Sequence, residues 1–213
     1  MYFTDIVQGG SALELFTEYL QKKNVATEKQ EILLEIGTVF QWEYKEIFLL
    51  YLSCFCKKNY AKENKKILCQ IGLEEDVLVC AEKKVIFQHN ELLKLLAVCC
   101  DLVEKILPLG TVVELKKEFL TEIPGVENIN QIRLVITNRF LVNDERTFHT
   151  YAGVIYPISN FNGKEVMCFS ENLINKVVFQ GFSDEQEDAY VTLMKYELLI
   201  EQEKISAGFS AVK

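Results

Sequence analysis

Histidine is scarce in this chain of 213 residues, and the short motifs that carry most enzyme chemistry are missing. The two histidines, His89 and His149, lie far apart, and neither stands in a metal-ligand spacing with another His or Cys. No Gly-rich phosphate loop follows an expected strand, and no Gly-x-Ser-x-Gly nucleophile motif occurs. We therefore expect no enzyme, no cofactor and no metal, and we identify no catalytic, cofactor-binding or metal-binding residue.

Paired cysteine spacings are absent as well. The seven cysteines are odd in number, include no Cys-x-x-Cys, and lie mostly among apolar residues. Reduced, buried thiols in a cytoplasmic protein are the simplest interpretation. Cys99-Cys100 could be redox-active, but neighbouring residues on a helix point in different directions, so burial is favoured there too.

Long hydrophobic runs are also lacking. The longest strongly apolar run, residues 47–56, is interrupted by Ser53. It is shorter than the roughly 18–20 residues that a helix needs to span a bilayer. The chain begins without a basic stretch followed by an apolar core, so we expect no secretory signal, no membrane span and a cytoplasmic location.

An excess of positive charge is the last missing feature. The net charge is −8, and residues 1–105 hold 13 basic against 16 acidic residues. The remainder is acidic too, so the electrostatic footprint of a nucleic-acid or anionic-membrane binder is absent. A hydrophobic content of 49% with only 3 Pro and 10 Gly indicates a folded chain without long linkers. A protein partner suits this composition better than nucleic acid or a small-molecule substrate.

The first half of the chain shows mainly helical signals. Ser11-Ala-Leu-Glu14 fits a capping box and opens an amphipathic helix, and Thr27-Glu-Lys-Gln30 fits a second one, with that helix stopping near Gly37. Residues 41–58 are apolar around most of a helical circumference, which predicts a central, buried helix. We therefore expect residues 1–106 to form a helical bundle with helices at 11–23, 27–37, 41–58, 62–71, 74–84 and 91–107.

The second half changes to an alternating pattern at Pro108. Alternation of apolar and polar residues predicts short strands in meander order, and Asn162-Gly163 is a strong hairpin signal. Ser183-Asp-Glu-Gln186 fits a third capping box, opening a helix at 184–204 that covers the sheet. The fold class expected is α+β, with a helical domain at 1–106 and a second domain at 107–213. The second domain is expected to hold a small antiparallel sheet of about five strands and the covering helix. The expected strands are 111–117, 131–142, 147–156, 164–169 and 176–180.

Three further features each have a structural and a functional interpretation. Gly153, inside the strand-like stretch 150–157, predicts close approach of another backbone or a large side chain. The acidic run Glu74-Glu75-Asp76 is most simply a complement to a helix dipole. Trp42, Tyr44 and Phe48 could anchor an interface, since aromatic residues dominate binding hot spots, but core packing is the favoured interpretation.

Four stretches between residues 107 and 182 form a recognisable pattern: Leu107-Pro-Leu-Gly-Thr-Val-Val-Glu-Leu-Lys116, Ile132-Arg-Leu-Val-Ile-Thr-Asn-Arg139, Tyr151-Ala-Gly-Val-Ile-Tyr-Pro157 and Phe169-Ser-Glu-Asn-Leu-Ile-Asn-Lys-Val-Val-Phe-Gln-Gly-Phe182. In order and spacing they resemble a domain-of-unknown-function family encoded beside LXG toxins in type VII secretion loci of Gram-positive bacteria. The chain departs from that family at Ile158-Ser159, where an acidic residue and Gly are usual, and at Asn138, where Gly is usual.

The resemblance implies a non-catalytic accessory protein that binds an LXG toxin before export, as a chaperone or targeting factor. An immunity protein that neutralises a cognate toxin by direct binding is the alternative, and the sequence does not choose between them. The matched stretches are structural and locate no partner-binding surface. Two routes of binding stay open: strand addition at an exposed sheet edge, and a groove between the helical half and the sheet, which we favour.

Overall fold

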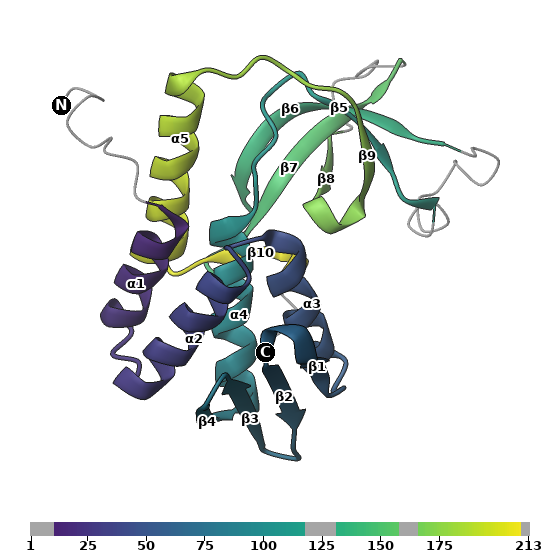
Figure 1. Ribbon diagram of the computed structural model, residues 1–213. Helices are drawn as coiled ribbons and strands as arrows, with labels where there is room; N and C mark the ends of the chain where they lie inside the picture. The colour runs from purple at the N-terminus through teal and green to yellow at the C-terminus, as the bar shows by residue number, and fades with distance from the viewer. Residues whose placement is uncertain (1–10, 118–130, 158–165, 210–213) are drawn as a thin grey trace. The chain divides into compact units, whose positions relative to one another are not determined.

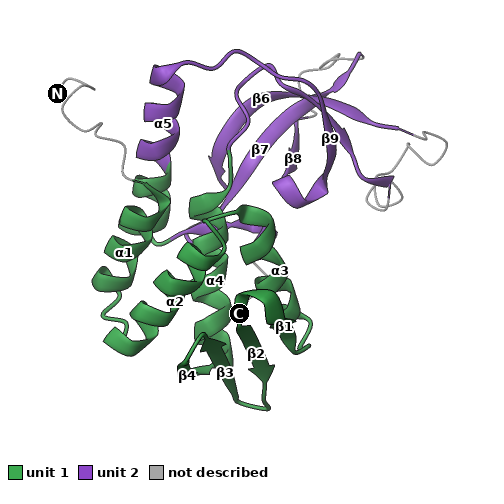
Figure 2. Ribbon diagram, in the orientation of Figure 1, with its two compact units in different colours: residues 1–105, 195–203, 211–213 green, residues 106–194, 204–210 purple. Residues whose placement is uncertain are grey.

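A computed structural model describes residues 11–117, 131–157 and 166–209. The chain divides into two compact units (Figure 2). The first unit contains residues 1–105, 195–203 and 211–213, and the second contains residues 106–194 and 204–210. Helices precede a largely antiparallel sheet, so the predicted α+β class is confirmed. In the described ranges no helix combines the length and apolarity that crossing a membrane requires.

The described part of the first unit contains four α-helices, a π-helical turn and a small sheet (Figure 1). The capping box of the first helix is confirmed: the Ser11 side chain and the Glu14 side chain each bond the other's backbone N–H. The second helix has Ala26 at its N-cap and no side-chain cap, so the second predicted capping box is wrong. The helices are α1 (Ala12–Lys22), α2 (Thr27–Val39), α3 (Tyr44–Phe55) and α4 (His89–Val103).

Two predicted helices of the first unit are wrong, because residues 60–88 form strands. An antiparallel meander joins them in the order β1-β2-β3-β4. Their burial alternates with a period of two, for example at Leu78 and Cys80 or at Val85 and Phe87, as on a half-buried sheet. Glu and Lys at the intervening positions had favoured helix over strand. The strands are β1 (Tyr60–Lys62), β2 (Ile67–Ile71), β3 (Glu75–Cys80) and β4 (Lys83–Gln88).

The central helix of the first unit is α4 rather than α3. Nearly every residue of α4 from Leu92 to Leu102 is buried. The predicted central helix, α3, instead leaves Leu49, Leu52 and Phe55 exposed on one side. Helix α3 packs on α4 and on β1 and β2, so its apolar circumference is only partly covered.

The C-terminal end of α4 is held by a lysine from far along the chain. The amine of Lys195 donates to the carbonyls of Leu102 (2.7 Å) and Glu104 (2.5 Å). A cation at this position complements the helix dipole. Burial lowers the pKa of Lys195 to about 8, while the acidic Glu104 and Asp101 act in the opposite sense. The π-helical turn that follows, Tyr196–Glu201, packs on α1 and α4.

The second unit is built on a six-stranded sheet. Its strand order is β10-β7-β6-β5-β9, and β8 pairs with β7 as well. All pairings are antiparallel except that of β10 with β7, so the sheet has one strand more than expected and one parallel pair. The strands are β5 (Val112–Leu115), β6 (Arg133–Val142), β7 (Thr147–Tyr156), β8 (Met167–Phe169), β9 (Ile174–Phe179) and β10 (Ile205–Ser206).

One face of this sheet forms the core of the second unit. The core residues are Val113, Leu115, Ile132, Leu134, Ile136, Tyr151 and Phe169. The predicted close approach at Gly153 is confirmed: a Cβ there would lie 2.4 Å from the carbonyl oxygen of Val135. The β6 register shifts opposite this glycine, between Ile136 and Asn138. The hairpin signal at Asn162-Gly163 lies outside the described residues.

The helix after the sheet, α5 (Glu185–Lys195), meets β6 near its N-terminus. Glu187 forms an ion pair with Arg139, and Tyr190 contacts Phe140 edge to face. The cap is Asp184 rather than Ser183, because the Asp184 carboxylate accepts the N–H of Glu187 (3.0 Å). Only the first part of the predicted 184–204 helix therefore belongs to the sheet unit, and residues 195–203 belong to the first unit.

Candidate functional site

An exposed apolar surface lies at one edge of the second unit's sheet. We call it the β9 patch, and its exposed members include Phe179 (64% exposed) and Phe182 (81% exposed). Single exposed apolar residues are ordinary, but a cluster of them on neighbouring segments is typical of an interaction surface. The β9 patch consists of Leu109, Val177, Val178, Phe179 and Phe182.

Strand β9 is the edge strand that carries most of this patch. Within the described parts of the chain, β5 is its one strand partner. The pairing register shifts twice, so that Val178 and Asn175 are left without a residue opposite on β5. Such bulges bend an edge strand and redirect its side chains, and they make regular addition of a further strand less favourable. The patch is thus better suited to docking through side chains than through a continuous backbone ladder.

A glycine and a threonine hold the two ends of the patch together. The N–H of Gly181 donates to the hydroxyl oxygen of Thr111 (3.0 Å), and that hydroxyl donates to the carbonyl of Pro108 (2.7 Å). A Cβ on Gly181 would lie 2.1 Å from the carbonyl oxygen of Leu109, so no larger residue fits this backbone approach. The backbone at Gly181 is therefore held against the backbone at Leu109.

A buried carboxylate fastens β9 to β5. Glu114 on β5 accepts hydrogen bonds from the side chains of Asn175 (3.0 Å) and Gln131, and forms an ion pair with Lys176 (3.2 Å). Burial alone would raise the pKa of Glu114, but these partners outweigh burial and lower it. The carboxylate stays ionised near neutral pH, and the bulged edge is held in one place.

The histidines have unrelated surroundings. In the first unit, Nδ1 of His89 lies 2.8 Å from the fully buried carboxylate of Asp76, which also accepts the N–H of Gly72 (3.3 Å). The acidic run at Glu74-Glu75-Asp76 thus leads into strand β3 rather than a helix, and its predicted dipole role is wrong. In the second unit, His149 lies on β7 beside a cavity.

Five of the seven cysteines are buried, as predicted, while Cys56 and Cys168 are exposed. Burial raises the pKa of both members of the Cys99-Cys100 pair, which confirms packing as their environment. Partial burial raises the pKa of the Cys168 thiol too. A raised pKa keeps a thiol protonated near neutral pH and makes it a weak nucleophile. No group of His, Cys, Asp and Glu residues in the described segments could hold a metal ion.

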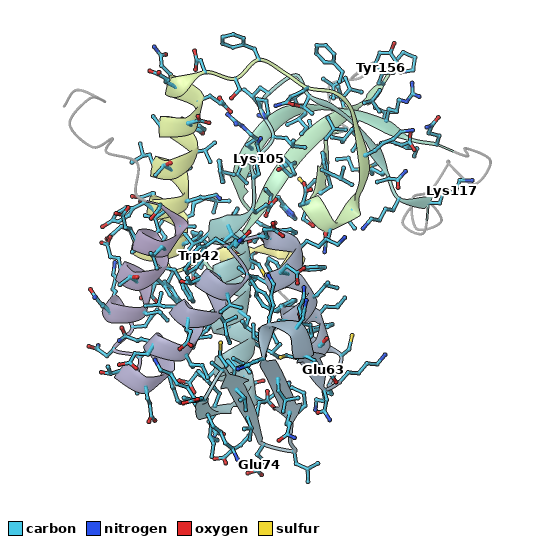
Figure 3. The ribbon with its side chains drawn as sticks, viewed as in Figure 1. Trp42, Glu63, Glu74, Lys105, Lys117 and Tyr156 are labelled. Carbon is cyan, nitrogen blue, oxygen red and sulfur yellow. The ribbon has the colours of Figure 1, made fainter. Side chains whose placement is uncertain are left out.

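Of the aromatic residues considered as interface anchors, Trp42 lies in the first unit and is half-buried (Figure 3). It meets Phe16 edge to face, and a Cβ on Gly37 would lie 2.5 Å from its ring. Tyr44 and Phe48 belong to a stacked series along α3. All three side chains are half-buried, so the predicted core role holds only in part: each packs against aromatic neighbours and keeps some exposed surface.

Residues 106–190 match the family model described as Domain of unknown function (DUF4176). The match supports the resemblance to a domain-of-unknown-function family that the four stretches indicated. All five residues of the β9 patch lie inside the matched region, whereas β10 lies outside it. No curated protein and no solved structure matches the chain.

Sequence reasoning located strand β9 but missed its exposed surface. The stretch from Val177 to Phe182 has only one strongly polar side chain, Gln180, which by itself indicates burial. The expected meander order is wrong, because β9 pairs with β5 rather than with β8. Meander order would also have placed the last strand at an edge, where one side has no neighbouring strand, so an edge position was the available signal. The register shifts between β5 and β9 have no sequence signature of their own.

Proposed function

We propose that this protein is a non-catalytic binding protein of the cytoplasm that holds an LXG toxin, as a chaperone or targeting factor for type VII secretion. The observation that carries the proposal is the β9 patch, which presents two phenylalanines to solvent on a firmly anchored edge. The resemblance of the four stretches to proteins encoded beside LXG toxins supplies the identity of the partner.

The features of the patch favour docking of an apolar partner surface. Aromatic side chains give a large contact area and are common among hot-spot residues. Lys176 is the one charged residue of β9, and its amine is engaged by Glu114. A lysine and two bulges on an edge strand also discourage pairing between copies of the same chain. The partner segment is therefore expected to be amphipathic, with apolar side chains that cover Phe179 and Phe182.

The direct test is co-expression with the LXG toxin of the neighbouring gene, followed by size-exclusion chromatography at low and moderate salt. Wild-type protein is expected to co-elute with the toxin at both salt concentrations, because burial of apolar surface depends little on ionic strength. A variant with Phe179→Ser and Phe182→Ser is expected to elute alone.

Leu73→Ser is the matched control, since Leu73 is a fully exposed apolar residue of the first unit that lies outside the patch. The control is expected to co-elute like wild type. Separate elution of folded wild-type protein and folded toxin at both salt concentrations would rule out the proposal. Equal loss of binding in the control variant would show that the patch is not the binding surface.

The same material separates a chaperone from an immunity protein. A chaperone is expected to bind the full toxin and to leave the activity of the isolated, folded toxic domain unchanged. Tight binding to that isolated domain with loss of its activity would replace the chaperone role by the immunity role.

A further inference from the structure

Helix α3 of the first unit (Figure 1) leaves three large apolar side chains exposed to solvent. They are Leu49 (41% exposed), Leu52 (39%) and Phe55 (42%). The C-cap residue, Cys56, is exposed as well. We call these four residues the α3 face, because neighbouring exposed apolar residues on one element are typical of an interaction surface.

The spacing of the α3 face matches that of a seam between packed helices. Leu49, Leu52 and Cys56 stand at positions i, i+3 and i+7, the heptad spacing at which two helices interlock their side chains. The N–H of Cys56 still donates to the carbonyl of Leu52 (2.9 Å), so the helical geometry continues to the end of this stripe. The backbone groups of a helix bond internally, so an added strand finds no ladder here. The matching occupant is therefore another amphipathic helix.

Exposed lysines flank the α3 face at both ends. Lys45 lies one turn before the stripe, and Lys57 and Lys58 follow it directly. These three lysines take part in none of the ion pairs between described residues. Of the nearby acidic residues, Glu46 pairs with a lysine of β1, and Glu43 is exposed. On a chain of net charge −8, this surface is locally basic and complements an acidic partner.

A second copy of this chain fits the α3 face poorly. In a parallel pair of α3 helices, each Lys45 would meet the Lys45 of the other copy. In an antiparallel pair centred on Leu52, Lys45 would lie opposite Asn59 of the other copy and beside its Lys58. Like charges meet in both arrangements, which disfavours self-pairing. A helix with acidic residues at both ends avoids this repulsion.

We propose that the α3 face binds an amphipathic helix of the LXG toxin, whose apolar stripe packs on Leu49, Leu52 and Phe55 and whose acidic ends pair with the flanking lysines. The inference rests on the proposed function, because it assigns a second contact on the same bound toxin. Helix α3 lies outside residues 106–190, the region that matches the family model. The β9 patch lies in the part shared with the family, and the α3 face adds a contact outside that part, where it can select among toxins.

The first test removes the apolar stripe. Leu49→Gln with Leu52→Gln keeps good helix formers and replaces exposed apolar groups by polar ones. Affinity for the LXG toxin, measured by isothermal titration calorimetry, is expected to fall about 10-fold or more, because two leucines no longer bury apolar surface. Leu73→Gln, at a fully exposed apolar residue outside the α3 face, is the matched control and should bind like wild type. Equal affinity of the folded double variant and wild type would overturn the inference.

The second test reverses the flanking charge. Lys45→Glu with Lys58→Glu changes two exposed side chains and is expected to leave the fold intact. It should weaken binding at low salt, and the difference from wild type should shrink as salt rises, because salt screens exposed charges. Lys66→Glu with Lys84→Glu, at two exposed lysines outside the flanks, is the matched control and should bind more tightly than the first pair. Binding of the Lys45→Glu, Lys58→Glu variant that equals or exceeds that of wild type would contradict an acidic partner helix.

The two exposed cysteines provide a test on unmutated protein. Cys56 belongs to the α3 face, whereas Cys168 lies on β8 in the second unit. Bound toxin is expected to slow the alkylation of Cys56 by N-ethylmaleimide, followed by mass spectrometry, and to leave the rate at Cys168 nearly unchanged. An unchanged rate at Cys56 in the complex would overturn the inference.

The outcomes separate this inference from the proposed function. If wild-type protein does not bind the toxin, both fail. If wild-type protein binds and the Phe179→Ser, Phe182→Ser variant does not, while the Leu49→Gln, Leu52→Gln variant binds as wild type does, only the α3 inference is overturned. If the free protein forms a dimer that Leu49→Gln with Leu52→Gln abolishes, a second copy covers the α3 face, and the toxin helix is overturned as its occupant.

Discussion

Helix α4 and strand β9 are both rich in apolar residues, yet one is buried and the other exposed. Helix α4 is contacted by α1, α3, β3, β4 and the π-helical turn Tyr196–Glu201, all of the first unit. Strand β9 has β5 on one side and no further strand on the other within the described residues. The comparison teaches that an apolar run predicts burial only when enough neighbouring elements surround it. Where they do not, the exposed run becomes a candidate for function.

The largest effect expected from this contrast is in the core of the first unit. Leu96→Ala removes a side chain that is almost fully buried on α4, and should lower the free energy of unfolding by about 2–5 kcal/mol. Phe179→Ala removes a larger side chain from β9 and should cost less than about 0.5 kcal/mol. Urea denaturation followed by circular dichroism measures both. Equal losses of stability for the two truncations would show that α4 and β9 do not differ in burial as described.

Gly153 tests whether the second unit is tightly packed away from its exposed edge. Gly153→Val places side-chain atoms against the carbonyl of Val135 and should cost about 1–3 kcal/mol, as overpacking does. Val154→Ile, a small enlargement at the half-buried neighbouring residue, serves as the control and should change stability little. An unchanged melting temperature for Gly153→Val would mean that β6 and β7 are not held so closely.

Alkaline pH should weaken the first unit through its buried thiols. Burial raises the pKa of Cys99 to about 12, and the hydrogen bond with Cys69 together with burial raises the pKa of Cys54. A folded-state pKa above the unfolded value of about 9 contributes stability that is complete below pH 9 and is lost as pH rises further. For each such thiol, the free energy of unfolding falls by about 1.4 kcal/mol per pH unit between pH 9 and the pKa of that thiol in the folded protein.

Lys195 acts in the opposite sense. Because its pKa is lowered to about 8 in the folded protein, the free energy of unfolding rises as the pH increases from about 8 to the ordinary pKa of lysine. Comparison of wild type with Cys99→Ala between pH 8 and 10 separates the two contributions. The variant is expected to lose stability less steeply than wild type over this range. Parallel curves would mean that Cys99 ionises as freely in the folded protein as in the unfolded chain.

The smallest effect on stability belongs to the β9 patch itself. Phe179→Ser and Phe182→Ser together should change the melting temperature by no more than about 2 °C, because neither side chain is part of the core. Thermal unfolding by circular dichroism checks this expectation. A large loss of stability would show that the patch supports the fold, and would weaken its interpretation as a docking surface.

The parts of the fold that the sequence predicted are those where local chemistry decides the structure. The Ser11–Glu14 capping box depends on a few neighbouring residues, and the close approach at Gly153 was signalled by the glycine itself, although its partner Val135 lies on another strand. The strands of the second unit alternate clearly enough to be found, although the parallel β10 has only two residues and no such pattern.

The missed parts depend on contacts that are distant in sequence. The region 60–88 alternates apolar with Lys and Glu, so its helical and strand patterns compete until the four strands pair. Helix α3 has the more continuous apolar sequence, but the number of packed neighbours makes α4 the central helix. The groove expected between the two halves stays a prediction, and so does strand addition at a sheet edge. The bulged β9 edge favours docking through side chains over strand addition.

The most direct test of the β9 patch as the toxin-binding surface is the dissociation constant measured by isothermal titration calorimetry. Wild-type protein and Leu73→Ser should bind the LXG toxin with the same affinity. The Phe179→Ser, Phe182→Ser variant should bind at least about 100-fold more weakly, as loss of two aromatic hot-spot residues implies. Affinity within about threefold of wild type for a folded double variant would contradict the account.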